Sequence, residues 1–318
     1  MAATGTVVAL SGGIGGAKLA LGLSRKLPPG CLTVVANVGD DFSHLGLHVS
    51  PDIDTLVYTL AGLADPQQGW GRAGETWSFM SALAGLGGPA WFRLGDGDLA
   101  MHVMRTHRLA QGVPLSQVTA EMCASLRIAT RILPASDDPV RTRVKTDQGW
   151  LDFQDWFVGH RAALTVRELA FAGAEQARPL PAVLEALAAP DLRAVVICPS
   201  NPLISIEPIL VVPGMREALA ACRAPVVAVS PLIGGRAVKG PTAAMMTDLG
   251  GVATAAGVAA RYRDLLDGYV IDEADRAMVN ELDVPAIATR TLMLTLADRE
   301  RLAEAVLAYA GRLRETMR

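Results

Sequence analysis

Glycine and lysine residues of the kind that bind phosphate groups lie close together near the N-terminus. The stretch "LSGGIGGAKLALGL" (10–23) places Gly12, Gly13, Gly15, Gly16 and Lys18 between a short apolar run and a helix-like run. A glycine-rich turn that leads into a helix exposes backbone N–H groups at the positive end of the helix dipole. Glycine also leaves room for a phosphate to approach the backbone. The spacing therefore predicts a phosphate site at these residues.

Neither of the two familiar phosphate-binding patterns fits this stretch. A Walker A loop has glycine before its lysine and serine or threonine after it, whereas here Ala17 precedes Lys18 and Leu19 follows. A dinucleotide fingerprint needs glycine where Lys18 stands. The alternative is a tight turn between a strand and a helix that holds no ligand. The lysine and the position after the first strand favour an anion.

Carboxylates gather in a second stretch, "NVGDDFSHLGLHVSPDIDT" (37–55). Asp40 and Asp41 follow the second apolar run, and Asp52 and Asp54 open the next helical run. In an open α/β sheet, ligands bind at the carboxyl ends of the strands. Carboxylates that converge there repel each other unless a cation or hydrogen-bond donors neutralise them, and Mg²⁺ bound to phosphate oxygens is the favoured interpretation.

The same stretch has readings that need no ligand. "SPDIDT" is typical of a helix start, with Ser50 as the N-cap and Pro51 as the first helical residue. Capping accounts for Asp52 better than for Asp54 or the Asp40–Asp41 pair. His44 and His48 are four residues apart and could share a metal on a helix, but the residues between them predict a loop.

Three later loops carry polar residues after apolar runs. Arg93 in "WFRLGDGDLAMH" stands between two apolar residues, so we expect it to have an anion or a planar ring as a partner. Asp96, Gly97 and Asp98 of the same loop are typical of a turn and a helix cap. The loops "ICPSNPLIS" and "VSPLIGGRAVKGP" offer hydroxyl, amide and glycine groups that suit a nucleoside diphosphate: Ser200, Asn201, Ser230 and Gly234.

Short β-branched runs predict the sheet that positions these loops. They are continuous rather than alternating, as expected for a parallel sheet covered on both faces, and they occur at 6–10, 32–38, 193–198, 225–230, 267–272 and 284–290. The fold class is therefore α/β, a Rossmann-like doubly wound parallel sheet. Residues 1–60 and 133–318 form the expected core, 61–132 an inserted, mainly helical subdomain, 140–158 a hairpin, and 297–318 an amphipathic helix.

Composition excludes several classes of function. The chain of 318 residues has a formal net charge of −3 and no dense Lys/Arg patch, so we expect no nucleic-acid partner. No apolar run reaches the length of a membrane span, and no signal peptide is visible, so we expect no membrane partner. Four widely spaced cysteines without a CxxC pair predict a cytoplasmic protein with neither disulfides nor a zinc site.

The motifs together resemble one family. "SGGIGGAK", "NVGDD", "SPDIDTLVYTL", "GWGRAGETW", "RLGDGDLAMH", "PSNPLISI" and "VSPLIGG" occur in this order. In these motifs the chain resembles the 2-phospho-L-lactate transferase family of deazaflavin coenzyme F-420 biosynthesis. The resemblance implies transfer of a phospholactyl-type group from a guanosine diphosphate conjugate to the deazaflavin Fo, with release of GMP. It also implies Mg²⁺ as cofactor and a homodimer.

The resemblance assigns expected roles to residues. Asp54 and Arg93 would contact Fo, while Asp40, Asp41 and Asp54 would hold Mg²⁺ or, for Asp54, orient the attacking hydroxyl group. The glycine loop with Lys18 would hold the diphosphate, and "PSNP" and "SPLIGG" would hold the guanosine. The inserted helices, with Trp70 and Trp77, would cover the deazaflavin ring.

Some questions stay open at this point. The family often has glycine where this chain has Glu207, whose carboxylate could pair with guanine or face solvent. The donor could carry a lactyl, enolpyruvyl or glyceryl group, and the "NVGDD" and "GWG…ETW" forms resemble a bacterial subgroup that takes enolpyruvyl. Two other functions are alternatives: a non-catalytic nucleotide-sugar-binding regulator with a similar glycine loop, and an NAD-dependent oxidoreductase.

Overall fold

The β-branched runs of the sequence form a parallel sheet at the centre of the molecule. The computed structural model describes residues 5–66 and 71–316. Within them, seven strands follow the order β14-β13-β10-β9-β1-β2-β5, and every neighbouring pair is parallel. The strands are β1 (Thr6–Ser11), β2 (Leu32–Ala36), β5 (Arg131–Pro134), β9 (Leu192–Ile197), β10 (Val226–Val229), β13 (Gly268–Asp272) and β14 (Ala286–Thr289).

The structure confirms the predicted Rossmann-like α/β class and six of its strands. The prediction missed β5, which spans only four residues and ends at Pro134. This strand pairs with β2 alone, at the edge of the sheet. Because an edge strand needs donors on one side only, it tolerates a proline and a short apolar run that carry little strand signal.

The order of the strands fixes where a ligand can bind. From β1 the chain proceeds through β2 to β5 on one side, and from β9 through β10 and β13 to β14 on the other. The direction of winding therefore reverses between β1 and β9. Doubly wound sheets bind their ligands in the crevice at this switch point, beside the carboxyl ends of the strands. The glycine loop follows β1 there, and the "PSNP" loop follows β9.

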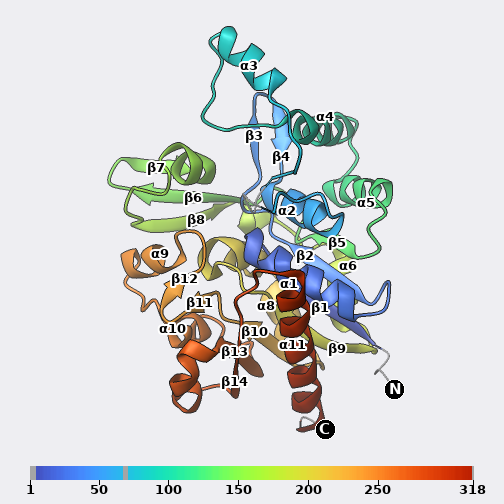
Figure 1. The fold of residues 1–318 in the computed structure, drawn as a ribbon, viewed down its shortest axis with the longest axis vertical. Coiled ribbons are helices and arrows are strands. Elements are labelled where there is room, and N and C mark those ends of the chain that lie inside the picture. The colour runs from blue at the N-terminus through green and yellow to red at the C-terminus, as the bar shows by residue number, and fades with distance from the viewer. Residues whose placement is uncertain (1–4, 67–70, 317–318) are drawn as a thin grey trace.

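Helices flank the sheet. The predicted C-terminal helix is confirmed as α11, which packs against α1 and the strands β9, β10, β13 and β14 (Figure 1). Helix α2 also packs against α1, so the helix that follows the glycine loop has both α11 and α2 as neighbours. The α-helices are α1 (Gly13–Lys26), α2 (Pro51–Leu60), α3 (Ser78–Gly85), α4 (Asp96–Ala110), α5 (Leu115–Ser125), α6 (Pro181–Ala188), α7 (Glu207–Leu210), α8 (Met215–Ala220), α9 (Thr242–Asp248), α10 (Ala255–Ala260) and α11 (Leu296–Thr316).

The segment between α2 and β5 is helical, as its sequence pattern predicts. It contains α3, α4 and α5, and α3 lies at the opposite end of the molecule from the C-terminus (Figure 1). Helix α4 packs against the small hairpin of β3 (Phe42–His44) and β4 (Leu47–Val49). His44 and His48 therefore lie on strands rather than in a loop, and Leu45 and Gly46 form the turn at positive φ. The division of residues 61–132 from the core stays a prediction.

A second small sheet lies beside the core. The predicted hairpin is confirmed for β6 (Arg141–Thr146) and β7 (Gly149–Asp152), but its expected second strand was too long, because residues 155–158 belong to a helical turn. Strand β8 (Glu168–Ala172) adds a third antiparallel strand. Short elements complete the described fold: strands β11 (Leu232–Ile233) and β12 (Arg236–Ala237), and helical turns η1 (Asp155–Gly159), η2 (Ala174–Gln176), η3 (Pro202–Ile206) and η4 (Glu273–Glu281). Among the described residues, no helix combines the length and apolar character needed to cross a membrane.

Candidate functional site

A cavity of about 720 Å³ opens at the switch point of the sheet. Its walls come from the loops after β1, β2, β9 and β10, from α2 and α4, and from the segment before α11. Most of the predicted site residues line it: Gly12, Gly13, Gly15, Lys18, Asp40, Asp54, Arg93, Ser200, Asn201 and Ser230. Three predicted residues, Gly16, Asp41 and Gly234, are not among its lining residues.

Two of the glycine-loop amides already have partners within the protein. Gly12 N donates to Ser200 Oγ at 3.3 Å, and Gly13 N donates to Asp52 Oδ1 at 2.7 Å. A side chain at Gly12 would run into Ser205, and one at Gly15 would run into the Pro199 carbonyl. The close approach of this loop to the chain after β9 thus explains the glycines without a phosphate. A phosphate site at the loop stays a prediction that depends on Lys18.

Lys18 brings a positive charge to the cavity wall. Its Nζ donates to the Met293 carbonyl at 3.0 Å. Partial burial lowers the pKa of Lys18, and the neighbouring cations Arg299 and Lys239 lower it further. Positive charges that gather on a cavity wall attract an anion, so this end of the cavity is suited to a phosphate group.

Two buried carboxylates share one amide group at the end of β2. Asn37 Nδ2 lies 3.1 Å from Asp40 Oδ1 and 2.8 Å from Asp52 Oδ2, and it also donates to the Ile204 carbonyl. Burial raises the pKa of Asp52 to about 6, although donation from Asn37 and Gly13 opposes the rise. Burial and the charge of Asp52 raise the pKa of Asp40 well above its usual value. The pair is therefore short of positive charge.

This carboxylate pair fits a divalent cation, but the three predicted metal ligands do not come together. Among the described residues, no group of three or more His, Cys, Asp or Glu side chains is placed to bind a metal jointly. Asp41 Oδ2 accepts from Ser50 Oγ at 3.0 Å, and Asp54 is paired with an arginine. Asp40 and Asp52 both line the cavity, so they are the side chains that a hard cation would use.

The raised pKa of Asp52 predicts a pH dependence of stability. In metal-free protein, the free energy of unfolding is expected to fall by about 2 kcal/mol between pH 4 and pH 6.5 through this group. Its folded pKa of about 6 lies above the usual 3.8, so the folded state keeps a proton that the unfolded chain has lost. The stabilisation is complete only well below the unfolded pKa of 3.8 and disappears as the pH rises through 6. Urea unfolding at several pH values, with EDTA present, measures the effect.

The Asp52→Asn variant isolates this contribution. The unfolding free energy of the wild type minus that of the variant is expected to fall over the same pH range, because asparagine does not titrate. Saturating Mg²⁺ is expected to restore, at pH 7, the stability that the wild-type protein loses as the pH rises. The stability of the variant is expected to stay nearly unchanged. A pH-independent difference would contradict the assignment to Asp52.

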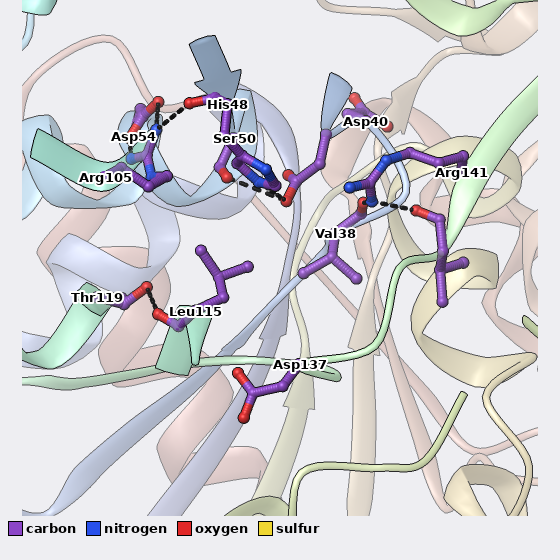
Figure 2. Close-up of polar contacts among 12 residues, drawn as sticks. Val38, Asp40, His48, Ser50, Asp54, Arg105, Leu115, Thr119, Asp137 and Arg141 are labelled. Atoms are coloured by element: carbon purple, nitrogen blue, oxygen red, sulfur yellow. Dashed lines mark hydrogen bonds and ion pairs between the residues drawn. The ribbon is translucent and has the colours of Figure 1, made fainter. Parts of the chain in front are cut away.

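A buried ion pair holds Asp54. Arg105, on α4, is fully buried and approaches both carboxylate oxygens of Asp54, with Nη1 lying 3.2 Å from Oδ2 (Figure 2). Arg105 Nη1 also donates to the His48 carbonyl at 3.3 Å, which ties α4 to β4 and α2. Burial raises the pKa of Asp54, and Arg105 opposes that rise. The pair therefore fixes the orientation of a carboxylate that lines the cavity.

The ion pair continues into a polar chain along α4. His102 Nδ1 lies 3.2 Å from Arg105 Nη1, and because the guanidinium can only donate, this nitrogen must accept. The other ring nitrogen, Nε2, lies 3.2 Å from Asp98 Oδ2. The Tyr58 hydroxyl group donates a hydrogen bond to Asp98 Oδ1, with the two oxygens 2.5 Å apart. The prediction from sequence assigned Asp98 to a turn and a helix cap, and not to this network.

Aromatic side chains surround the part of the cavity near Arg93. The Arg93 guanidinium stacks over the Trp77 ring at 3.9 Å from its centroid, which confirms the expectation of a planar ring as partner. Trp91 and Phe92 line the cavity and contact each other edge to face. Phe153 and Phe157, which also line it, are stacked with centroids 5.3 Å apart. Flat apolar walls of this kind suit a planar ring system.

The structure also locates two further residues that the sequence singled out, Gly234 and Glu207, and both lie away from the cavity lining. Gly234 forms the turn between β11 and β12 at positive φ, and its N–H donates to Asp275 at 2.9 Å, so it does not face the cavity. Glu207 pairs with Arg216 at 3.6 Å and Arg261 at 3.9 Å, away from the cavity lining. The predicted contact of Trp70 with a ligand lies outside the described residues.

The prediction from sequence missed Asn37, Tyr58, His102 and Arg105. Asp98, His102 and Arg105 are spaced i, i+4, i+7, which is the spacing of one helix face. Polar residues on the face that packs inward are a signal for a buried network, and this signal was available. Asn37 gave no such signal, because its role depends on Asp52 and the Ile204 carbonyl, which lie 15 and 167 positions away along the chain.

Comparison with known proteins places the chain among transferases. Residues 7–288 match the family model described as 2-phospho-L-lactate transferase CofD. The chain is 42% identical over 298 residues to a phosphoenolpyruvate transferase of Streptomyces griseus, covering 92% of this chain and 93% of that protein. It is 44% identical over 305 residues to a protein of the same name from Kitasatospora aureofaciens, covering 94% of each.

A solved structure resembles the fold. A UPF0052 family protein of Bacillus halodurans aligns with a TM-score of 0.60 and 17% sequence identity, covering 96% of this chain and 99% of that chain. At this identity the match supports the architecture and says nothing about the ligand.

Proposed function

This chain belongs to the 2-phospho-L-lactate transferase CofD family, and from that premise we propose the reaction that it catalyses. The chain is a transferase, and the proposed acceptor is the deazaflavin Fo of coenzyme F-420 biosynthesis. The proposed donor is a guanosine diphosphate conjugate, and GMP is the proposed leaving group. Because its relatives are named phosphoenolpyruvate transferases, we propose an enolpyruvyl donor ahead of a lactyl or glyceryl one.

One observation carries the proposal: a single cavity is lined by cationic, acidic and aromatic side chains. We propose that a diphosphate and its nucleoside bind at Lys18, Ser200 and Asn201. We propose that a deazaflavin and its hydroxyl-bearing side chain bind at Asp54, Arg93 and the aromatic rings. Transfer of a phosphoryl group needs both substrates side by side, and it is catalysed chiefly by positioning and charge neutralisation.

In the proposed reaction, the terminal hydroxyl oxygen of Fo bonds to the phosphorus that carries the enolpyruvyl group. The bond from this phosphorus to the oxygen of GMP breaks, and the hydroxyl proton leaves. Asp54 faces the cavity with its orientation fixed by Arg105, so it can accept a hydrogen bond from the hydroxyl group and receive its proton. Lys18 balances charge on the diphosphate as GMP departs.

The proposed cofactor is Mg²⁺, held by Asp40 and Asp52. When bound, it would neutralise negative charge on the diphosphate. Asn37 Nδ2 contacts one oxygen of each carboxylate, and Gly13 N donates to the other oxygen of Asp52. We also propose a homodimer located in the cytoplasm, which light scattering of the purified protein and localisation of a tagged chain would test.

Mass spectrometry of the product tests the function. Fo is incubated with each guanosine diphosphate conjugate in turn, and the enolpyruvyl donor is expected to give the corresponding phosphodiester of Fo together with GMP. Parallel titrations with GDP, a UDP-sugar and NADH, followed by thermal shift, address the other functions. Binding of a UDP-sugar or NADH, with neither Fo nor GDP bound, would overturn the proposal.

A further inference from the structure

Arg93 reaches the cavity without a carboxylate partner among the described ion pairs. It lies on the segment between Trp91 and α4, is exposed, and lines the cavity. Its recorded contact is with the Trp77 ring, at 3.9 Å from guanidinium carbon to ring centroid. A ring stacked on one face of a guanidinium restricts its orientation but leaves the N–H donors at its edge unoccupied. The charge therefore remains available to a ligand.

The segments that carry Trp77 and Arg93 are locked together by reciprocal helix caps. Asp96, at the start of α4, accepts from Ser78 N at 3.1 Å and Phe79 N at 3.0 Å, which are the first amides of α3. Glu75, just before α3, accepts from Gly97 N at 2.7 Å and Asp98 N at 2.9 Å, which are amides in the first turn of α4. Each segment thus satisfies the helix start of the other.

Further contacts fix the spacing of the two segments. Thr76 donates through Oγ1 to Asp96 at 2.6 Å, and Asp96 N donates to the Thr76 carbonyl at 3.0 Å. A side chain at Gly95 would run into Glu75, and one at Gly97 would run into Arg72. Trp77 lies directly between Thr76 and Ser78, so its ring is placed by bonds on both sides.

We propose that Trp77 is a positioning residue that acts through Arg93, so that acceptor binding depends on the stacked pair. The proposal deepens the proposed function, because it assumes that the acceptor is the ligand of Arg93. It also differs from the expectation that Trp77 covers the deazaflavin ring itself: here the ring contacts Arg93, and the aromatic walls come from Trp91, Phe92, Phe153 and Phe157.

A double-mutant cycle on Trp77 and Arg93 tests this role. Trp77→Leu is expected to raise the KM for Fo by about three- to tenfold with little change in kcat, as loss of a cation–π contact predicts. In an Arg93→Ala background, the same change is expected to alter the KM by less than twofold. Trp77→Phe, which keeps an aromatic face, should recover most of the wild-type KM.

Trp150→Leu is the matched control. Trp150 also carries a stacked cation, Lys145 at 5.6 Å, but it lies on β7 outside the cavity lining, so this variant should leave both constants unchanged. The NMR resonance of the Arg93 Nε–Hε group, assigned by its absence from the Arg93→Lys variant, should show a ring-current shift in the wild-type protein. This measurement does not depend on whether a Trp77 variant folds.

The outcomes separate the two proposals. A Trp77→Leu effect of equal size with and without Arg93 would mean that Trp77 contacts the acceptor directly, and an unshifted Arg93 resonance would mean that the pair does not form; either overturns the role of Trp77. If the wild-type protein does not bind Fo in the fluorescence titration, the proposed function fails instead, whatever the resonance shows.

Discussion

The Asp54→Asn variant is expected to turn over about 10²- to 10⁴-fold more slowly than the wild type, the range typical for loss of a group that takes a proton in the transition state. It is also expected to be less stable by about 3 kcal/mol, because the substitution leaves the buried Arg105 without its anion. Steady-state assays of product formation measure the first effect, and urea unfolding measures the second.

A double variant separates these two consequences. Asp54→Asn combined with Arg105→Met removes both charges, so most of the lost stability should return, because no buried charge is left unpaired. Turnover should stay low, because methionine and asparagine cannot replace the carboxylate. Asp264→Asn, which breaks the exposed pair with Arg216, is the matched control and should change neither quantity measurably. If Asp54→Asn keeps near wild-type turnover, Asp54 has a structural role only.

The sequence was sufficient to predict the architecture because the relevant signals are local. Continuous β-branched runs specify strands that are buried on both faces, and Gly12 to Gly16 mark the turn that leaves β1. Strand order was not predictable residue by residue, but alternation of strands and helices restricts it strongly. The switch point between β1 and β9 then explains why polar loops distant in the chain line one cavity.

The site was predictable in composition but not in pairing. The acidic stretch pointed to a carboxylate cluster, but not to the partners that divide it: Asn37, the first residue of the stretch, binds Asp52, and Arg105 on α4 binds Asp54. Arg105 pairs with Asp54 across 51 positions of the chain. A long-range pair of this kind leaves no mark in local spacing, so the sequence, which suggested Mg²⁺ or the acceptor hydroxyl group as the partner of Asp54, did not predict its pairing with a guanidinium.

Glycine content also gave an incomplete account. The four glycines of the loop were expected to make room for a phosphate. Gly12, Gly15 and Gly16, however, each lie too close to residues of the chain after β9 to carry a side chain. Small residues are required wherever backbone or side-chain atoms approach closely, and a ligand is only one such case. The charge of Lys18 is therefore the more specific evidence for an anion at this position.

The Lys18→Met variant is expected to lose about 10²-fold in kcat/KM, chiefly through a higher KM for the donor. A charge-assisted contact to a phosphate is worth roughly 1.5 to 3 kcal/mol, and tenfold corresponds to about 1.4 kcal/mol. Methionine keeps an unbranched side chain of similar length, so the cavity shape should change little. Initial rates at varied donor concentration, with Fo saturating, measure the effect.

Stability measurements distinguish a binding role for Lys18 from a structural one. In the ligand-free protein, partial burial and the cations Arg299 and Lys239 oppose the charge of Lys18 and lower its pKa. Removing this charge should therefore leave the melting temperature unchanged or raise it, while donor binding weakens. Lys145→Met, at an exposed ion pair with Glu168, should leave donor binding intact. If the Lys18→Met protein melts at a clearly lower temperature and binds GDP normally, Lys18 has a structural role. A residue retained for ligand binding is instead expected to lower the stability of the ligand-free protein.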